Sequence, residues 1–164
     1  MRIFTKSQQK NKKIFLLLAL FLFILVWLIK EKWQIAGLWQ EIFLFIFAYS
    51  LGLFLMLGDE KYLQKVYAAE LEQKILITRT PLFLIGLPFL SIFMLTSTGS
   101  IVGIALILAI NLVIFIEIFQ LTTQSEKFNQ HFLMGAKNKM TLLEIKIVKI
   151  VFIIYFLILL FLLS

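Results

Sequence analysis

The chain has 164 residues, of which 62% are hydrophobic, and its mean hydropathy is +1.00. Soluble domains are only about 45–50% apolar, so a water-soluble fold of this size could not bury so much apolar surface. The net charge of +7 is better explained by orientation in a membrane than by a nucleic-acid partner. The absence of cysteine excludes disulfides and thiolate metal sites. With a single histidine as well, we expect no metal and no cofactor.

The first predicted span follows a basic tail. Residues 1–13 contain five basic residues, and residues 14–29 are sixteen unbroken apolar residues. The run ends in Trp27-Leu28-Ile29-Lys30, without the small residues of a signal-peptidase site, so we interpret it as an uncleaved span. Residues 35–57 form the second predicted span, and Gly58 is expected to end it as a helix C-cap.

Residues 58–80 are the first charged stretch long enough to have structure of its own. Their apolar residues recur at helical spacing, which predicts a helix at the membrane interface. The third predicted span, 81–95, opens with Thr80 as N-cap and Pro81 at the first helical position. Pro88 lies inside it and is expected to kink it. The small residues Thr96–Ser100 then form a tight turn into the fourth predicted span, 101–119.

The second polar stretch, 120–144, is expected to contain a short helix. Thr123 and Glu126 match a capping box, which would open this helix. An aromatic pair spaced i,i+4 and a glycine that would end the helix support it: Phe128, Phe132 and Gly135. The fifth predicted span covers 145–163. Its features are a second capping box and two lysines placed to extend toward the membrane surface: Thr141, Glu144, Lys146 and Lys149.

The basic residues separate by side when five spans are assumed. Fourteen of the sixteen fall in residues 1–13, 58–80 and 120–149, and the other two fall in the loop between the first and second spans. Lysine and arginine are enriched in cytoplasmic loops, so this pattern predicts a multi-pass protein of the cytoplasmic (inner) membrane. The N-terminus and the two long polar segments would be cytoplasmic, and the C-terminus would lie outside.

Three polar residues of the predicted spans are the candidate intramembrane polar positions, namely Glu41, Asn111 and Glu117. Ionisable groups in a membrane are costly, so each is a candidate functional position. Glu41 has two interpretations: an interfacial residue paired with Lys30 or Lys32, or part of a polar path. Asn111 lies near mid-membrane and is expected to form an interhelical hydrogen bond. Glu117 lies at the cytoplasmic end of its span and is expected to be interfacial.

Enzymatic interpretations lack support in the sequence. His131 is interpreted as a surface histidine without a role. The hydroxyls of Thr96–Ser100 have no neighbouring base, and the chain contains neither a nucleophile elbow nor a nucleotide-binding loop. We therefore expect no catalytic residues, and we expect that the protein is not an enzyme.

One short motif resembles a known group. Leu95-Thr96-Ser97-Thr98-Gly99-Ser100, with Gly103 after it, is similar to the hairpin turn of a family of small multi-spanning bacterial membrane proteins. In that family an Arg-Ser/Thr-x-Leu-Phe motif precedes the hairpin, and Arg79-Thr80-Pro81-Leu82-Phe83 is similar to it. The resemblance covers roughly the second half of the chain. The family tends to carry a histidine in the fourth span, which this chain lacks. It has no assigned activity, so the resemblance implies topology only.

The sequence thus predicts an all-α, polytopic membrane protein: a single membrane domain, 1–164, with five spans and short cytoplasmic interfacial helices. The leading functional interpretation is a non-enzymatic structural or interaction component, in contact with the lipid bilayer and assembling with itself or with another membrane protein. The alternative is a small transporter or channel subunit with a polar path near Glu41 and Asn111. The candidate interaction residues carry both signs of charge: Lys61, Lys65, Glu70, Glu72 and Lys74.

Overall fold

The computed structural model describes residues 6–30, 38–59, 77–97, 100–133 and 138–163, with side chains described from residue 11 and not for residues 25–30 or 38. Within these ranges the chain forms six α-helices, one short 3-10 helix and no strand, which confirms the all-α prediction. In chain order the elements are α1 (Lys6–Lys30), α2 (Leu38–Gly58), η2 (Ile77–Arg79), α4 (Pro81–Ser97), α5 (Ile101–Leu121), α6 (Ser125–Phe132) and α7 (Leu142–Leu163).

Three helices of the described chain are long and apolar enough to cross a membrane. They are Trp39–Gly58 within α2, Ile101–Leu121 and Leu142–Leu163, with mean hydropathies of 2.0, 2.8 and 2.8. At 1.5 Å per residue each reaches about 30 Å, the thickness of a hydrocarbon core. Of the other predicted spans, α4 is apolar but has 17 residues, and α1 begins with eight residues that include four lysines. The count of five spans stays a prediction.

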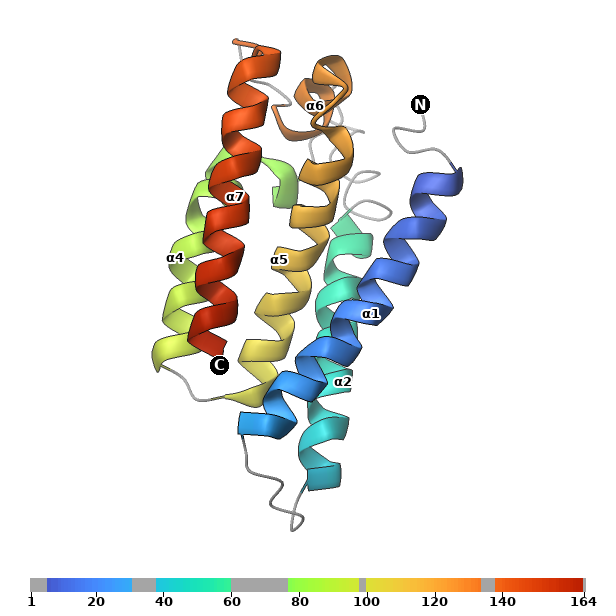
Figure 1. The fold of residues 1–164 in the computed structure, drawn as a ribbon, viewed down its shortest axis with the longest axis vertical. Coiled ribbons are helices and arrows are strands. Elements are labelled where there is room, and N and C mark those ends of the chain that lie inside the picture. Colours follow the sequence, from blue (N-terminus) through green and yellow to red (C-terminus); the bar gives the residue numbers. More distant parts are fainter. Residues whose placement is uncertain (1–5, 31–37, 60–76, 98–99, 134–137, 164) are drawn as a thin grey trace.

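Helix α5 lies at the centre of the bundle, with α1 and α2 on one side and α4 and α7 on the other (Figure 1). Within the apolar window of α5, 67% of the residues are buried, compared with 28% in α2 and 22% in α7. Most of α5 contacts protein, which agrees with a helix that has apolar residues on every face. The large apolar side chains of α4 and α7 that point outward instead present a surface suited to lipid; Leu82 and Phe161 are 82% and 79% exposed.

Helix α2 packs closely against α5 at Gly52. A Cβ atom built on Gly52 would lie 2.7 Å from the carbonyl oxygen of Leu106 and 2.9 Å from Cβ of Ala109. Only glycine fits against the neighbouring backbone at this distance. Small residues at a helix interface let two backbones approach closely, and Gly52 has this role between α2 and α5.

Several predicted helix ends are confirmed. The Thr80 hydroxyl accepts a hydrogen bond from the Phe83 amide at 3.3 Å, so Thr80 caps α4. Thr141 and Glu144 form the expected reciprocal capping box at α7, with the Thr141 amide 2.7 Å from Glu144 Oε2 and the Glu144 amide 3.4 Å from the Thr141 hydroxyl. Helix α2 ends at Gly58, the predicted position, but the backbone at Gly58 does not have the left-handed conformation of a glycine C-cap.

Two local predictions are wrong. The capping box of Thr123 and Glu126 does not form, because α6 begins one residue later than the box requires, with Gln124 at the N-cap and no side-chain capping bond. The turn between the third and fourth spans is also shorter than predicted. Helix α4 continues through Thr96 and Ser97, and the Thr96 hydroxyl donates to the Ile92 carbonyl within the helix. The low helix propensity of threonine and serine thus does not end α4 at Leu95.

Some predictions concern residues outside the described ranges. These are the interfacial helix over most of 58–80, the stop at Gly135, and any pairing of Glu41 with Lys30 or Lys32. The candidate interaction residues also fall there: Lys61, Lys65, Glu70, Glu72 and Lys74. Only the two flanks of that segment, Asp59 and Ile77–Arg79, are described.

The α2–α5 contact generates a prediction for Gly52. We expect Gly52→Ala to destabilise the protein by about 1–3 kcal/mol, because the new methyl group meets backbone atoms that cannot rotate away. The measurement is loss of helical circular dichroism on heating in a mild detergent. Gly86→Ala is the matched control: its Cβ would have nothing within 4 Å, so that variant should be neutral or stabilised by up to about 1 kcal/mol. Equal melting of the two variants would contradict the close packing.

Candidate functional site

A buried ionic cluster lies at the end of the bundle where α2 and α5 end (top of Figure 1). Its centre is Glu117, in the last turns of α5, whose side chain is 0% exposed. Three side chains from other segments contact its carboxylate. Lys12 Nζ of α1 lies 2.5 Å from Oε1, Arg79 contacts both oxygens, and His131 Nε2 of α6 lies 3.0 Å from Oε2.

Arg79 makes the most contacts in the cluster. Its Nε donates to Glu117 Oε2 at 3.0 Å and its Nη2 donates to Oε1 at 2.9 Å. This is the bidentate geometry that makes arginine–carboxylate pairs strong and directional. The third nitrogen, Nη1, donates to the carbonyl of Met56 at 3.2 Å and to the Thr78 hydroxyl at 2.6 Å. The guanidinium is only 1% exposed, so it is held almost entirely by protein groups.

Asp59 closes the cluster on the α2 side. Its Oδ2 accepts hydrogen bonds from the Thr78 amide at 2.8 Å and from the Thr78 hydroxyl, and it lies 3.6 Å from Arg79 Nη1. Asp59 is the last described residue before 60–76 and Thr78 follows that segment closely. These bonds therefore bring the two flanks of the 60–76 segment together at the end of the bundle.

His131 and Glu117 are more buried than predicted. His131 was interpreted as a surface residue, yet it is 2% exposed; Glu117 was expected at the interface, yet it is fully buried. The reason is the position of α6, which folds back onto the end of α5 through buried Phe128 and Phe132. Their rings lie 4.9 Å apart, as the i,i+4 spacing predicted. Asn129 also fixes α6 by exchanging two 2.9 Å hydrogen bonds with the backbone of Met140.

The charges of the cluster balance. Lys12 and Arg79 offset Asp59 and Glu117, with His131 as a further polar contact. Removing a carboxylate from water costs several kcal/mol, and the paired cations offset this cost only in good geometry. The cluster joins α1, the end of α2, η2, α5 and α6. Within the described ranges, no group of three or more His, Asp or Glu residues is arranged to hold a metal ion. The evident physical role of the ionic cluster is to hold these five segments together.

Sequence reasoning missed most of this cluster. Glu117 was singled out, but Lys12, Asp59 and Arg79 were treated as ordinary flanking charges. One available signal was that a carboxylate inside an apolar run requires a cation at the same membrane depth. Several basic residues lie at that end of the predicted spans, however, and hydropathy does not distinguish Arg79 from Lys127 or Lys13. The choice among them is made by packing.

A second polar cluster lies deeper in the bundle, around Asn111 of α5. Asn111 Nδ2 donates to the Ser91 hydroxyl of α4 at 2.7 Å and to the Ile107 carbonyl at 2.8 Å. Its Oδ1 accepts a 2.6 Å hydrogen bond from the Tyr155 hydroxyl of α7. Asn111 is 2% exposed. The predicted interhelical hydrogen bond is confirmed, and it joins three helices at once.

The structure does not bring Glu41 and Asn111 together. Gly52 of α2 packs against Leu106 and Ala109 of α5, which sets the two helices side by side at that level. Glu41 lies eleven residues before Gly52, about 16 Å along α2 toward its start. Asn111 lies two residues beyond Ala109, in the opposite direction. Glu41 is half-buried, and Glu117 belongs to the ionic cluster. The three candidate polar residues therefore occupy three different sites.

The ionic cluster predicts a large effect for Glu117→Gln. The substitution leaves Arg79 buried without its carboxylate, and breaking a buried ion pair in this way costs about 3–5 kcal/mol. Thermal unfolding in detergent measures the loss. Glu126→Gln, at an exposed carboxylate on α6, is the control and should stay within about 0.5 kcal/mol of wild type. The double variant Arg79→Met/Glu117→Leu should lose less than the sum of its single variants, because it removes both charges. Wild-type stability of Glu117→Gln would contradict this role of the ionic cluster.

The Asn111 cluster predicts a smaller effect. Asn111→Leu removes the hydrogen bonds to Ser91 and Tyr155 and should destabilise the protein by on the order of 1 kcal/mol. The same melting assay should show no change for Glu41→Gln, since the described chain shows no ion pair at Glu41. The reverse ranking would place Glu41, and not Asn111, among the groups that hold the helices together.

Comparison with protein-family models, curated proteins and solved structures finds no match to this chain. What the protein does has therefore to follow from its own residues. Their main feature is that the polar side chains inside the bundle connect helices. Asn111 joins α4, α5 and α7, and Glu117 joins α1, η2, α5 and α6.

Proposed function

We propose that the protein is a non-enzymatic interaction component of the cytoplasmic membrane. In this proposal five helices, α1, α2, α4, α5 and α7, cross the bilayer, with the N-terminus and the ionic cluster on the cytoplasmic side. The segment 60–76 is the part that binds a protein partner. The distribution of basic residues supports the orientation, because fourteen of sixteen fall on the side of the ionic cluster when all five helices cross.

The observation that carries the proposal is the clamp at the base of segment 60–76. Thr78 donates two hydrogen bonds to Asp59, and Arg79 ties both flanks to Glu117 in the centre of the bundle. Burying an arginine between two carboxylates costs desolvation free energy, and here this arrangement holds the two flanks of the segment together. A fixed position of both flanks suits a segment that another protein has to recognise.

The charge of the segment favours a protein partner over lipid. Residues 60–76 contain Glu60, Glu70 and Glu72 together with Lys61, Lys65 and Lys74, so their net charge is zero. Helices that bind anionic lipid are rich in lysine and arginine on the polar face. A balanced mixture gains little from an anionic surface, whereas it can match a protein surface of complementary pattern.

The polar contacts of the bundle favour this function over a transport path. Asn111 and Glu117 are two of the three candidate polar residues of the predicted spans, and each of them is bound by side chains of neighbouring helices. Glu41 lies at a different level of α2 from Asn111, so the two do not form one line of polar groups. The transporter alternative thus has no observation in its favour in the described chain.

The proposed partner surface predicts the outcome of a charge reversal. Reversing Lys61, Lys65 and Glu72 together inverts the charge at three of the six charged positions and changes the net charge of the segment from zero to −2. Partners that recognise the original charge pattern should therefore be lost. The measurement is quantitative mass spectrometry of proteins that co-purify with the tagged protein in mild detergent. We expect at least one specific partner to fall about tenfold or more, since like charges placed opposite each other cost several kcal/mol.

The matched control reverses Glu126 and Lys139, two exposed charges outside the segment, and should leave the partners unchanged. Reporter fusions at residues 58 and 164 check that each variant still inserts with the first position inside and the second outside. If the Lys61/Lys65/Glu72 variant inserts normally and its partners are unchanged, the segment only connects its two flanks and does not bind a partner. A cytoplasmic C-terminus would overturn the five-span topology.

A further inference from the structure

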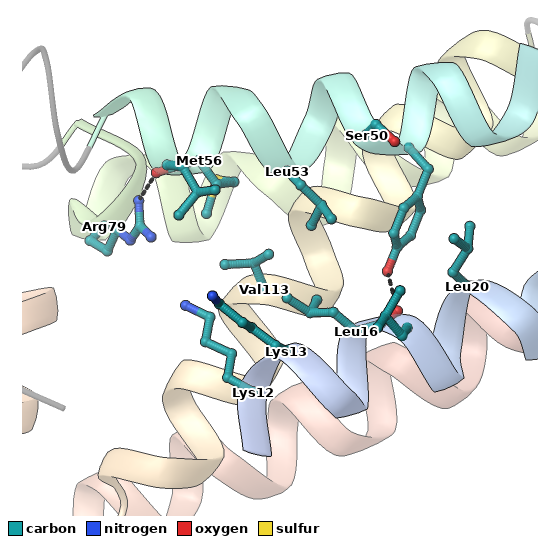
Figure 2. Close-up of a pocket in the computed structure, with 12 residues that line it drawn as sticks. Lys12, Lys13, Leu16, Leu20, Ser50, Leu53, Met56, Arg79 and Val113 are labelled. Carbon is teal, nitrogen blue, oxygen red and sulfur yellow. Dashed lines mark hydrogen bonds between the residues drawn. The ribbon is translucent and has the colours of Figure 1, made fainter. Parts of the chain in front are cut away.

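A cavity of about 540 Å³ lies between α1 and α2, bordered by α5 (Figure 2). This volume is within the range of roughly 300–1,000 Å³ found for small-molecule sites. Tyr49 of α2 connects the two helices, because its hydroxyl donates a hydrogen bond to the Leu16 carbonyl of α1 at 3.1 Å. The exposed side chains Leu17 and Leu57, 67% and 59% exposed, line the cavity, which therefore opens on the outer surface of the bundle.

The two ends of the cavity differ in character. Lys12, Lys13 and Arg79 lie at one end, whereas Leu20 and Ser50 lie at the other (Figure 2). Between them the walls are aliphatic, with Leu16 from α1 and Leu53 from α2. No carboxylate is among the described side chains that line the cavity. Three positive charges therefore lie at the cationic end of the cavity. Asp59 and Glu117, which do not line the cavity, neutralise two of them, those of Arg79 and Lys12.

Lys13 is the group that the ionic cluster does not account for. It follows Lys12 directly, its side chain is exposed, and none of the ion pairs found in the described chain includes it. Lys12 also lines the cavity, and its side chain is 16% exposed. An anion at this end would contact the neighbouring ammonium groups of Lys12 and Lys13. The charges of the ionic cluster balance without Lys13, so this end of the cavity has a net excess of one positive charge.

We propose that this cavity binds one anionic phospholipid. The headgroup phosphate lies at Lys12 and Lys13, and one acyl chain runs between α1 and α2 toward Leu20 and Ser50. From Lys12 to Leu20 the rise of α1 is about 12 Å, enough for a substantial part of an acyl chain. The second chain lies over Leu17 and Leu57 in the bilayer, through the open side of the cavity.

The orientation of the cavity matches that of a lipid in the inner leaflet. With the ionic cluster on the cytoplasmic side, the cationic end lies at headgroup level and the apolar end points to the bilayer centre. Basic pockets between helices on this side are a recognised setting for anionic headgroups. The inference rests on the membrane placement proposed above, but not on the partner of segment 60–76. The two are tested separately, because lipid retention is measured on the purified protein alone.

The test is native mass spectrometry of the protein purified in mild detergent and mixed with phosphatidylglycerol, phosphatidylcholine or oleate. We expect one phosphatidylglycerol per chain, retained about fivefold more strongly than phosphatidylcholine. Lys13→Gln should lower phosphatidylglycerol retention about fivefold, the effect of one basic residue at an anionic surface. Lys146→Gln removes an exposed lysine of α7 that does not line the cavity, and it should leave retention unchanged.

A second pair of variants tests the acyl end. Ser50→Trp fills the cavity beyond Leu53 and should reduce retention of phosphatidylglycerol, whereas Phe54→Trp, on the same helix but outside the cavity lining, should not. Circular dichroism confirms that each variant is folded. Equal retention of the two phospholipids, or an equal effect of Lys13→Gln and Lys146→Gln, would overturn the proposal. Retention of oleate but not of phosphatidylglycerol would show that the ligand of the cavity is a free fatty acid and not a phospholipid.

Discussion

The burial of one carboxylate constrains one whole end of this protein. Glu117 is fully buried in the last turns of the central helix, and a carboxylate taken out of water is stable only beside cations in good geometry. Meeting that requirement brings Lys12 of α1, Arg79 of η2 and His131 of α6 to one point. Segments more than one hundred residues apart in the sequence are thereby held together, and the flanks of 60–76 with them.

The ionic cluster and the proposed lipid site share two cations. Lys12 and Arg79 bind Glu117 on one side and line the cavity on the other. An anion bound at Lys13 and Lys12 would therefore offset the one positive charge, that of Lys13, which the ionic cluster leaves unbalanced. Lipid occupancy and the stability of the clamp at segment 60–76 are consequently linked through the same side chains. This link gives the membrane a physical route to influence a partner-binding segment, if both proposals hold.

Helix positions could be predicted from sequence because they depend on local properties. The apolar run 101–119 lies within α5, and the caps at Thr80 and Thr141 form as their spacing indicated. The role of Asn111 was also accessible, because a lone amide in an apolar run has to find a partner on another helix. One local prediction failed: α6 begins at Ser125, one residue later than the predicted capping box requires, and its Phe128 and Phe132 pack against the end of α5.

The sequence by itself determined the class of the protein, the extent of its apolar helices and the presence of polar groups inside them. The tertiary structure decided which helix is central and which residues meet. Hydropathy could not reveal this, because α5 and α7 have the same mean hydropathy of 2.8, although α5 is surrounded by protein and α7 is largely exposed. It also could not choose Arg79 from the basic residues near Glu117. Any basic residue could in principle pair with the Glu117 carboxylate, but only the packing of the helices decides which one lies within 3 Å of it.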